Sequence, residues 1–303
     1  MQTRLSASCV GRLAARSLAS ARSGTVGEIL SVFPASLYVK TTDSDLVFVT
    51  NRQLRSPVTL NLDSKTNLQQ IIKPQESVSI LENGIRIGES VQIDLRSAAQ
   101  CNEQQRPRID QYALAKETLY HSSMILMIID KQLSVLDPAS LAHGGAAKFV
   151  SNGVLAFRRS DDVNALCRAA HGIVGLGMGF TPSGDDLLAG FFATYNSFAH
   201  VVSHKTINLG FDALLRRTGW ISAKLLDYMQ RQVLDDQVAT LIDSAATHDS
   251  DTFVLALETL LPRGHISGID ILVGVLLALA IIHDLSEDAE ITRIVANRLG
   301  LLY

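Results

Sequence analysis

The feature that most constrains the fold is a change in hydrophobic periodicity near residue 101. Between about residue 25 and residue 97, short β-branched runs alternate with turn signals, which is typical of strands. The expected strands are Glu28–Phe33, Ser36–Thr41, Leu46–Thr50, Val58–Leu62, Ser77–Leu81, Ile85–Ile87 and Val91–Leu95. From Asp110 onward, through Met124–Ile129, the apolar residues recur with helical spacing. This order predicts an α+β chain, with a small β-barrel or sandwich ahead of a mainly helical domain.

The junction predicts a strand-rich domain over residues 1–105 and a helical domain over residues 106–303. We expect mostly antiparallel strands, with a hairpin turn at Asn83-Gly84, because both residues tolerate positive φ. The further expected helices are Asp161–Val174, Asp185–Ala199, Phe211–Gln232, Asp236–Thr247, Asp251–Leu261, Gly268–His283 and Glu287–Leu299. Their expected caps are Ser160, Asp235 or Asp236, and Ser286.

Composition narrows the function classes. The 303 residues are 47% hydrophobic, enough for a large folded core, and the net charge is -3. That balance gives no general attraction to nucleic acid or to an anionic membrane, so we expect neither as a partner. The apolar run Ile271–Ile282 is shorter than the roughly 20 residues of a membrane span, which predicts a buried core helix. Three scattered cysteines, Cys9, Cys101 and Cys167, predict reduced thiols in a cytoplasmic protein.

The opening segment, from Met1 to Gly24, carries several arginines and no acid, so two interpretations stay open. One is a mitochondrial transit peptide. The other is an ordinary amphipathic helix with an apolar stripe at Leu5, Cys9, Leu13 and Leu18, which we favour.

A glycine-rich loop, Gly175-Leu-Gly-Met-Gly-Phe-Thr-Pro-Ser-Gly-Asp-Asp186, is the strongest sign of a ligand site. Its glycines permit backbone conformations closed to other residues, while the intervening Leu176, Met178 and Phe180 are expected to anchor it on apolar neighbours. Free amides at the following helix start can bind an oxyanion. The alternative is a tight turn between helices. The candidate binding residues are Gly175, Gly177, Gly179, Thr181, Ser183 and Gly184.

A second copy of the end of this motif lies much further along the chain. Ser183-Gly-Asp-Asp-Leu-Leu-Ala-Gly190 matches Ser267-Gly-Ile-Asp-Ile-Leu-Val-Gly274 at five positions, which makes Asp186 and Asp270 equivalent. Gly190 and Gly274 each lie one helical turn after the aspartate, where the missing side chain permits close helix approach. We therefore expect two helix starts packed side by side around one pocket, with Ser267 and Gly268 as further binding residues.

Acidic residues at these helix starts would repel a bare phosphate. Either Mg²⁺ bridges Asp185, Asp186 and Asp270 to an anionic ligand, or the carboxylates bind the N–H groups of an amide or carbamoyl compound directly. Both options stay open, beside the simpler one that these are ordinary first-turn acids. No cofactor other than Mg²⁺ is suggested.

Two more positions are candidates. His265, which precedes Ser267 in the turn before the helix, would act as an acid, a base or an oxyanion donor, or else only cap its turn. Ser222, in Thr218-Gly-Trp-Ile-Ser222, offers a hydroxyl to the ligand or to its own backbone. His171 is more typical of a core residue. No nucleophile elbow, Walker loop, Rossmann fingerprint or metal-binding cysteine pair is present, so covalent catalysis has no clear candidate.

The glycine loop, Thr218 to Ser222, and Gly264-His-x-Ser-Gly-x-Asp-x-Leu-x-Gly274 together resemble the AllH subunit family of bacterial oxamate carbamoyltransferase. The first motif is highly specific, and the resemblance covers the helical half. It implies allantoin or purine catabolism and two companion subunits. The implied reaction transfers a carbamoyl group between oxalurate and phosphate, giving oxamate and carbamoyl phosphate. Met178 and Phe180 replace the proline and leucine usual in the family loop, so the resemblance does not fix the substrate.

On this resemblance, loop amides receive substrate oxygens, and Asp186 or Asp270 holds amide hydrogens or a metal. The repeated motif and the turn before it, and not the resemblance, make Asp186, Asp270 and His265 the candidates for catalysis. Two other functions stay open. One is a Mg²⁺-dependent hydrolase like the ADP-ribosylglycohydrolases, although their full acidic set is missing. The other is a ligand-binding regulatory subunit without catalysis of its own.

Overall fold

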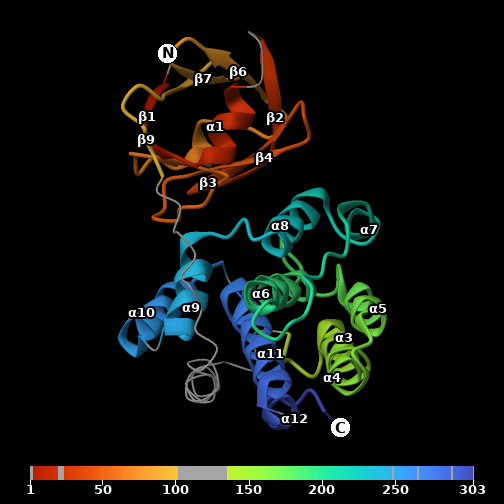
Figure 1. Cartoon of the computed structure of the whole chain (residues 1–303). Helices are drawn as coiled ribbons and strands as arrows, with labels where there is room; N and C mark the ends of the chain where they lie inside the picture. The colour runs from red at the N-terminus through yellow and green to blue at the C-terminus, as the bar shows by residue number, and fades with distance from the viewer. Residues whose placement is uncertain are drawn as a thin grey trace. The chain divides into compact units, whose positions relative to one another are not determined.

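The computed structural model describes residues 3–19, 24–101, 135–247, 249–264, 266–287 and 289–302. The chain divides into two compact units, residues 1–105 and 106–303, shown in Figure 1. The first is a β-barrel and the second is helical, so the α+β fold predicted from the sequence is confirmed. The helical segments expected between Asp110 and Ile129 lie outside the described residues.

Eight strands close the barrel in the ring order β5-β4-β3-β2-β6-β7-β8-β1, because β1 pairs with β5 as well as with β8. Buried aliphatic side chains fill it, among them Ile29, Val49 and Ile85. The strands are β1 (Thr3–Val10), β2 (Thr25–Phe33), β3 (Ser36–Thr41), β4 (Leu46–Thr50), β5 (Thr59–Leu62), β6 (Ser77–Leu81), β7 (Gly84–Ile87), β8 (Val91–Asp94) and β9 (Ala99–Gln100). A 3₁₀ turn, Leu68–Gln70, follows β5.

The pairing is mixed, which corrects the antiparallel prediction. β1 runs parallel to β8 and β9, and β4 runs parallel to β5, while the other neighbouring pairs are antiparallel. Only strands joined by a tight hairpin must run antiparallel, and none of these three pairs is joined in that way.

The chain opens with a strand where an amphipathic helix was expected. In β1 the side chains of Leu5, Ala7 and Cys9 are buried in alternation with exposed neighbours, and helix α1 (Arg12–Ala19) begins only after Gly11. The spacing between Leu5 and Cys9 fits both a helical face and a strand face. The segment forms a strand because the barrel needs β1 to close the ring between β5 and β8.

The hairpin between β6 and β7 is present, but its turn residues are Glu82 and Asn83, one position earlier than predicted. Gly84 already pairs with Leu81. A Cβ atom at Gly84 would lie 2.1 Å from the carbonyl oxygen of Ile93, so this glycine permits the close approach of β8.

A disulfide joins Cys9 to Cys101, with 5.3 Å between the Cα atoms. The parallel register of β1 and β9, in which Val10 pairs with Gln100, brings the two cysteines together. The prediction of reduced thiols is therefore wrong for this pair. Cys167 is a free thiol.

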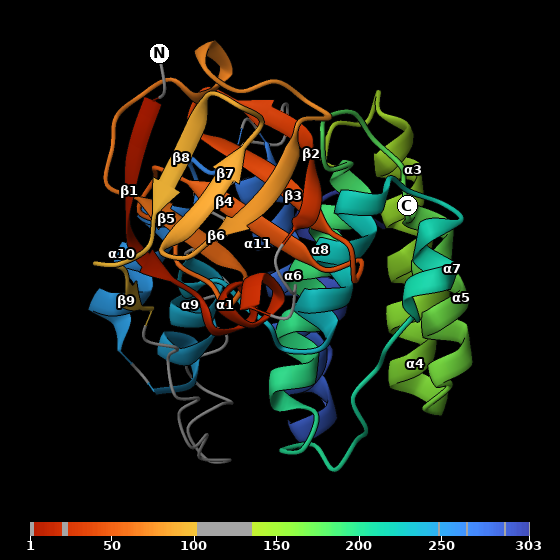
Figure 2. The ribbon, with the colours of Figure 1, turned by 90° about the horizontal axis from the view of Figure 1, so that it is seen from above.

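The helical unit is built around α6 and α11. Figures 1 and 2 show these two helices at its centre, with α9 and α10 on one side and α3, α4 and α5 on the other. The helices are α3 (Leu141–Phe149), α4 (Leu155–Ser160), α5 (Val163–Ile173), α6 (Ser183–Phe198), α7 (Phe211–Leu215), α8 (Trp220–Gln230), α9 (Asp236–Thr247), α10 (Ser250–Leu260), α11 (Ser267–Glu287) and α12 (Ile291–Arg298). A π-helical stretch, Val150–Val154, joins α3 to α4.

Helix α11 is the core helix predicted from its apolar run. By length and composition, Ser267–Ser286 would be able to cross a membrane, but 94% of its apolar window is buried inside the unit. Such a helix is typical of a protein core as well.

Two details differ from the sequence prediction. The expected helix Phe211–Gln232 is two helices, α7 and α8, separated by an extended Gly219. Asp235 caps α9 as predicted, accepting the amide of Val238 at 3.0 Å, whereas Asp162 takes the cap position expected for Ser160.

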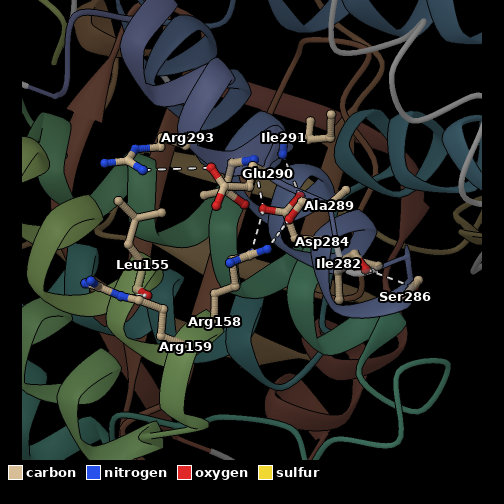
Figure 3. Close-up of polar contacts among 11 residues, drawn as sticks. Leu155, Arg158, Arg159, Ile282, Asp284, Ser286, Ala289, Glu290, Ile291 and Arg293 are labelled. Atoms are coloured by element: carbon tan, nitrogen blue, oxygen red, sulfur yellow. Dashed lines mark hydrogen bonds and ion pairs between the residues drawn. The ribbon is translucent and has the colours of Figure 1, made fainter.

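The third expected cap, Ser286, lies within α11, and Asp284 takes its role. Its Oδ1 accepts the amide of Ile291 at 2.6 Å and its Oδ2 accepts that of Thr292 at 3.0 Å, which caps α12. Figure 3 shows Arg158 reaching the same carboxylate from α4, with Nε 3.4 Å from Oδ2, while its terminal nitrogen donates to the carbonyl of Ala289. This buried cluster ties α4 to α11 and α12.

Candidate functional site

Helices α6 and α11 cross in close contact at the two repeated glycines. A Cβ atom at Gly190 would lie 2.0 Å from the carbonyl oxygen of Ile271, and one at Gly274 would lie 1.9 Å from that of Leu187. Each blocking carbonyl directly follows the aspartate of its own motif. The two copies, distant along the chain, therefore pack against each other as the sequence predicted, and the crossing is nearly symmetric.

The same symmetry holds at the helix starts. The amide of Gly184 donates to the carbonyl of Leu176 at 2.8 Å, and the amide of Gly268 donates to that of Arg263 at 3.1 Å. The next two amides at each start donate to Pro182 and to Ile266. The amide of Gly184, expected to be free for an oxyanion, is therefore used within the protein, and so is that of Gly268.

Hydroxyl groups of each motif interact with the carboxyl of the other. Asp186 accepts the Thr181 hydroxyl at 2.9 Å and interacts with Ser267 across the crossing. In the opposite direction, Ser183 interacts with Asp270. The hydroxyl oxygens of Thr181 and Ser267 lie 3.3 Å apart and are only partly buried, so they form the solvent side of this group.

Asp270 is fully buried, and its Oδ1 accepts the amide of Val135 at 2.6 Å. Its Oδ2 makes no hydrogen bond of acceptable geometry with any of the described residues. Deep burial with few donors disfavours the charged form of this carboxyl.

Burial perturbs both carboxyl groups. It raises the pKa of Asp186 to about 7, with the nearby charge of Asp270 adding to the rise and the two hydroxyls and Arg263 opposing it. Burial also raises the pKa of Asp270 to about 6, against the amide of Val135 and the hydroxyl of Ser183. A group that titrates near neutral pH and lies among polar side chains is suited to proton transfer.

Asp185 has a different role from its neighbour. Its carboxylate accepts the amide of Gly175 at 2.7 Å and the hydroxyls of Thr218 and Ser222 at 2.5 and 2.6 Å. Burial raises its pKa, and these three donors oppose the rise. Asp185 and Ser222 therefore fasten the glycine loop to α8, and their polar atoms are used within the protein. Thr218 and Ser222 lie one helical turn apart, so both hydroxyls can reach the carboxylate of Asp185. This spacing is the feature of the sequence that indicates a shared partner.

The glycine loop has the backbone that the sequence predicted. Gly175, Gly177 and Gly179 have φ values of +78°, +108° and +114°, a region that other residues rarely adopt. Leu176 packs on the core and Phe180 is 44% exposed, whereas Met178 is 84% exposed and does not anchor the loop as expected.

Three consecutive backbone N–H groups of the loop make no hydrogen bond to the protein. The amides of Gly177, Met178 and Gly179 donate to no acceptor in the part of the chain that the structure describes. The loop thus offers donors to an anion, whereas the amides of Gly184, Asp185 and Asp186 at the following helix start are used within the protein.

The remaining candidate residues contribute little to the description of the site. His265 lies outside the described residues. His171 contacts the carbonyl of Cys167 through Nδ1 at 2.8 Å, as a packed histidine does. Within the described ranges, no group of three or more His, Cys, Asp or Glu side chains gathers as they do around a metal ion held by the protein alone, and the Mg²⁺ site stays a prediction.

Fold and site define a class: an α+β protein in which a closed eight-stranded barrel precedes a helical unit with two matched, acidic helix starts. Two family models agree with this division. The AllH family N-terminal domain matches residues 3–101, and the model described as oxamate carbamoyltransferase subunit AllH matches residues 173–279. The chain belongs to the AllH family, as its motifs indicated, and is a carbamoyltransferase subunit that works with companion subunits. No curated protein matched the chain, and neither did any solved structure.

Proposed function

We propose that the helical unit binds the carbamoyl-bearing substrate of the transferase, oxalurate or carbamoyl phosphate, at the Asp186–Asp270 pair. One observation supports this proposal most directly. Two buried carboxyls, one from each of the crossing helices, lie behind the half-buried hydroxyls of Thr181 and Ser267. A carbamoyl group presents N–H donors and a carbonyl acceptor at neighbouring atoms. Carboxyls that accept N–H groups beside hydroxyls that donate to oxygen match this pattern.

The chemistry of the exchange requires one proton to move. When an oxygen of hydrogen phosphate bonds to the terminal carbamoyl carbon of oxalurate, the bond from that carbon to the oxamate nitrogen breaks. The proton of hydrogen phosphate must end on that nitrogen. We assign this relay to Asp186, whose pKa of about 7 lets it accept and release a proton at neutral pH. The three loop amides would hold the anionic end of the substrate.

The test uses the complete transferase complex with the variant Asp186→Asn. Asparagine keeps the size of the side chain but cannot relay a proton, so we expect turnover to fall by about 100-fold or more. The matched control is Asp251→Asn, which changes an exposed acid in the first turn of α10. Unchanged turnover of Asp186→Asn would refute the relay.

Ligand binding distinguishes the proposed transferase role from a regulatory subunit and from a hydrolase. Calorimetry of carbamoyl phosphate with the Asp186→Asn/Asp270→Asn variant should show weaker binding than with the wild-type chain. If binding weakens while turnover of the complex is unchanged, the chain is a regulatory subunit. If Mg²⁺ alone binds tightly to the isolated chain and binding is lost in this variant, the hydrolase alternative holds.

A further inference from the structure

The tip of the glycine loop, Gly177–Phe180, presents apolar side chains to solvent beside the candidate site. Met178, at 84%, is among the most exposed large apolar side chains in the described residues. Contiguous exposed apolar surface on a folded protein commonly marks an interaction site.

The tip stands on a rigid base. The carboxylate of Asp185 holds the amide of Gly175 at 2.7 Å, and the Leu176 carbonyl accepts the amide of Gly184 at 2.8 Å. Gly177 lies close to the start of α6, since a Cβ atom at Gly177 would lie 2.8 Å from the amide nitrogen of Ser183. These contacts hold the chain on both sides of the tip. A partner that buries Met178 therefore orders less backbone than it would in a loop held at neither side.

The surroundings of the tip carry positive charge. The carbonyl of Arg217 lies against Gly175, which brings the turn after α7 to the base of the loop. Arg216 and Arg217 are both exposed, against the single acid Asp212 between residues 211 and 219. The acids of the site itself, including Asp185, are buried. The turn after α7 therefore contributes two exposed arginines near the base of the loop.

We propose that the tip Gly177–Phe180, together with Arg216 and Arg217, is the docking surface for a companion subunit of the transferase. The partner would present an apolar pocket for Met178, rimmed by carboxylates that pair with the arginines. The proposal rests on the subunit role and is independent of the proton relay assigned to Asp186. Because the tip leads directly into Thr181, a partner docked there would also cover the candidate site.

The experiment co-expresses the full chain with its companion subunits and measures assembly by sedimentation without substrate. Met178→Asp places a charge at the anchor, and Arg216→Glu/Arg217→Glu reverses the rim. Each should weaken assembly by at least about 30-fold, the scale of an interface anchor. The control is Leu255→Asp on α10, a 60% exposed leucine outside the surface, which should assemble like the wild type.

Three results would overturn the proposal. One is normal assembly of both surface variants. Another is an equal loss in Leu255→Asp, which would indicate a general effect of added charge. The third is a self-association of the isolated chain that Met178→Asp removes while assembly with the companions persists, which would make a second copy the occupant. The fluorescence of Trp220, the sole tryptophan, verifies that each variant's helical unit is folded.

Discussion

The crossing of α6 and α11 gives the sharpest prediction. In an exposed helix interior, replacing glycine by alanine stabilises by about 1 kcal/mol. At Gly190 the new Cβ would lie 2.0 Å from the Ile271 carbonyl oxygen, whereas ordinary van der Waals contact begins at 3.4 Å. The obstacle is backbone, so no side-chain rotation relieves it and the helices must move apart. Overpacking of this kind costs about 3 kcal/mol at the upper end of its usual range. We therefore expect Gly190→Ala and Gly274→Ala to destabilise the helical unit by about 2 kcal/mol each.

The assay is thermal unfolding followed by the fluorescence of Trp220, which lies in the same unit as the crossing. A loss of about 2 kcal/mol in a unit of this size lowers the midpoint by about 4 to 8 °C. The control is Gly144→Ala in α3, where an added Cβ meets nothing within 4 Å and should raise the midpoint. If Gly190→Ala and Gly274→Ala raise the midpoint as Gly144→Ala does, the close crossing is refuted.

Three further predictions concern charge. Because burial raises the pKa values of Asp186 and Asp270 above the unfolded value of 3.8, their favourable contribution is present below pH 4 and is lost as pH rises through about 6 to 7. Urea unfolding should therefore show that changing pH from 5.5 to 8 costs the wild type more stability than it costs Asp186→Asn/Asp270→Asn; an equal cost would contradict the assignment. In the complete transferase, the relay accepts a proton and then releases it in either direction, so it must start ionised both to break down oxalurate and to form it. The initial rates of both directions should therefore rise together through about pH 7, and rates that rise in one direction and fall in the other would contradict the relay. Finally, Arg158→Met leaves Asp284 buried without its cation and should cost about 3 kcal/mol in urea unfolding; a loss below about 1 kcal/mol would show that the two amides at α12 suffice.

Local patterns predicted most of the fold. β3, β4, β6 and α9 have the boundaries that alternation, helical spacing and turn signals indicated. The errors arose where two periods coincide or where a distant partner decides. Leu5 and Cys9 fit a helix and a strand equally well, and only the barrel's need for a closing strand separates them. The parallel direction of β1 depends on β8, which lies at the other end of the barrel sequence and leaves no local signal.

The site was predictable where the chain repeats itself. Two copies of Ser-Gly-x-Asp with a following glycine indicated the packing of α6 against α11, and the glycine φ values follow from the loop sequence. The separate roles of Asp185 and Asp186 were not predictable, although the residues are adjacent. They depend on which face of α6 meets α8 and which meets α11, and therefore on tertiary packing.

The position of β1 in the ring has a consequence for synthesis. β1 leaves the ribosome ahead of the other barrel strands and pairs with β5, β8 and β9, so its ladders are complete only after residue 100 has emerged. Until then the nascent barrel keeps open edges, which invite pairing with other chains. The strand made first in the barrel is thus among the last to complete its pairing.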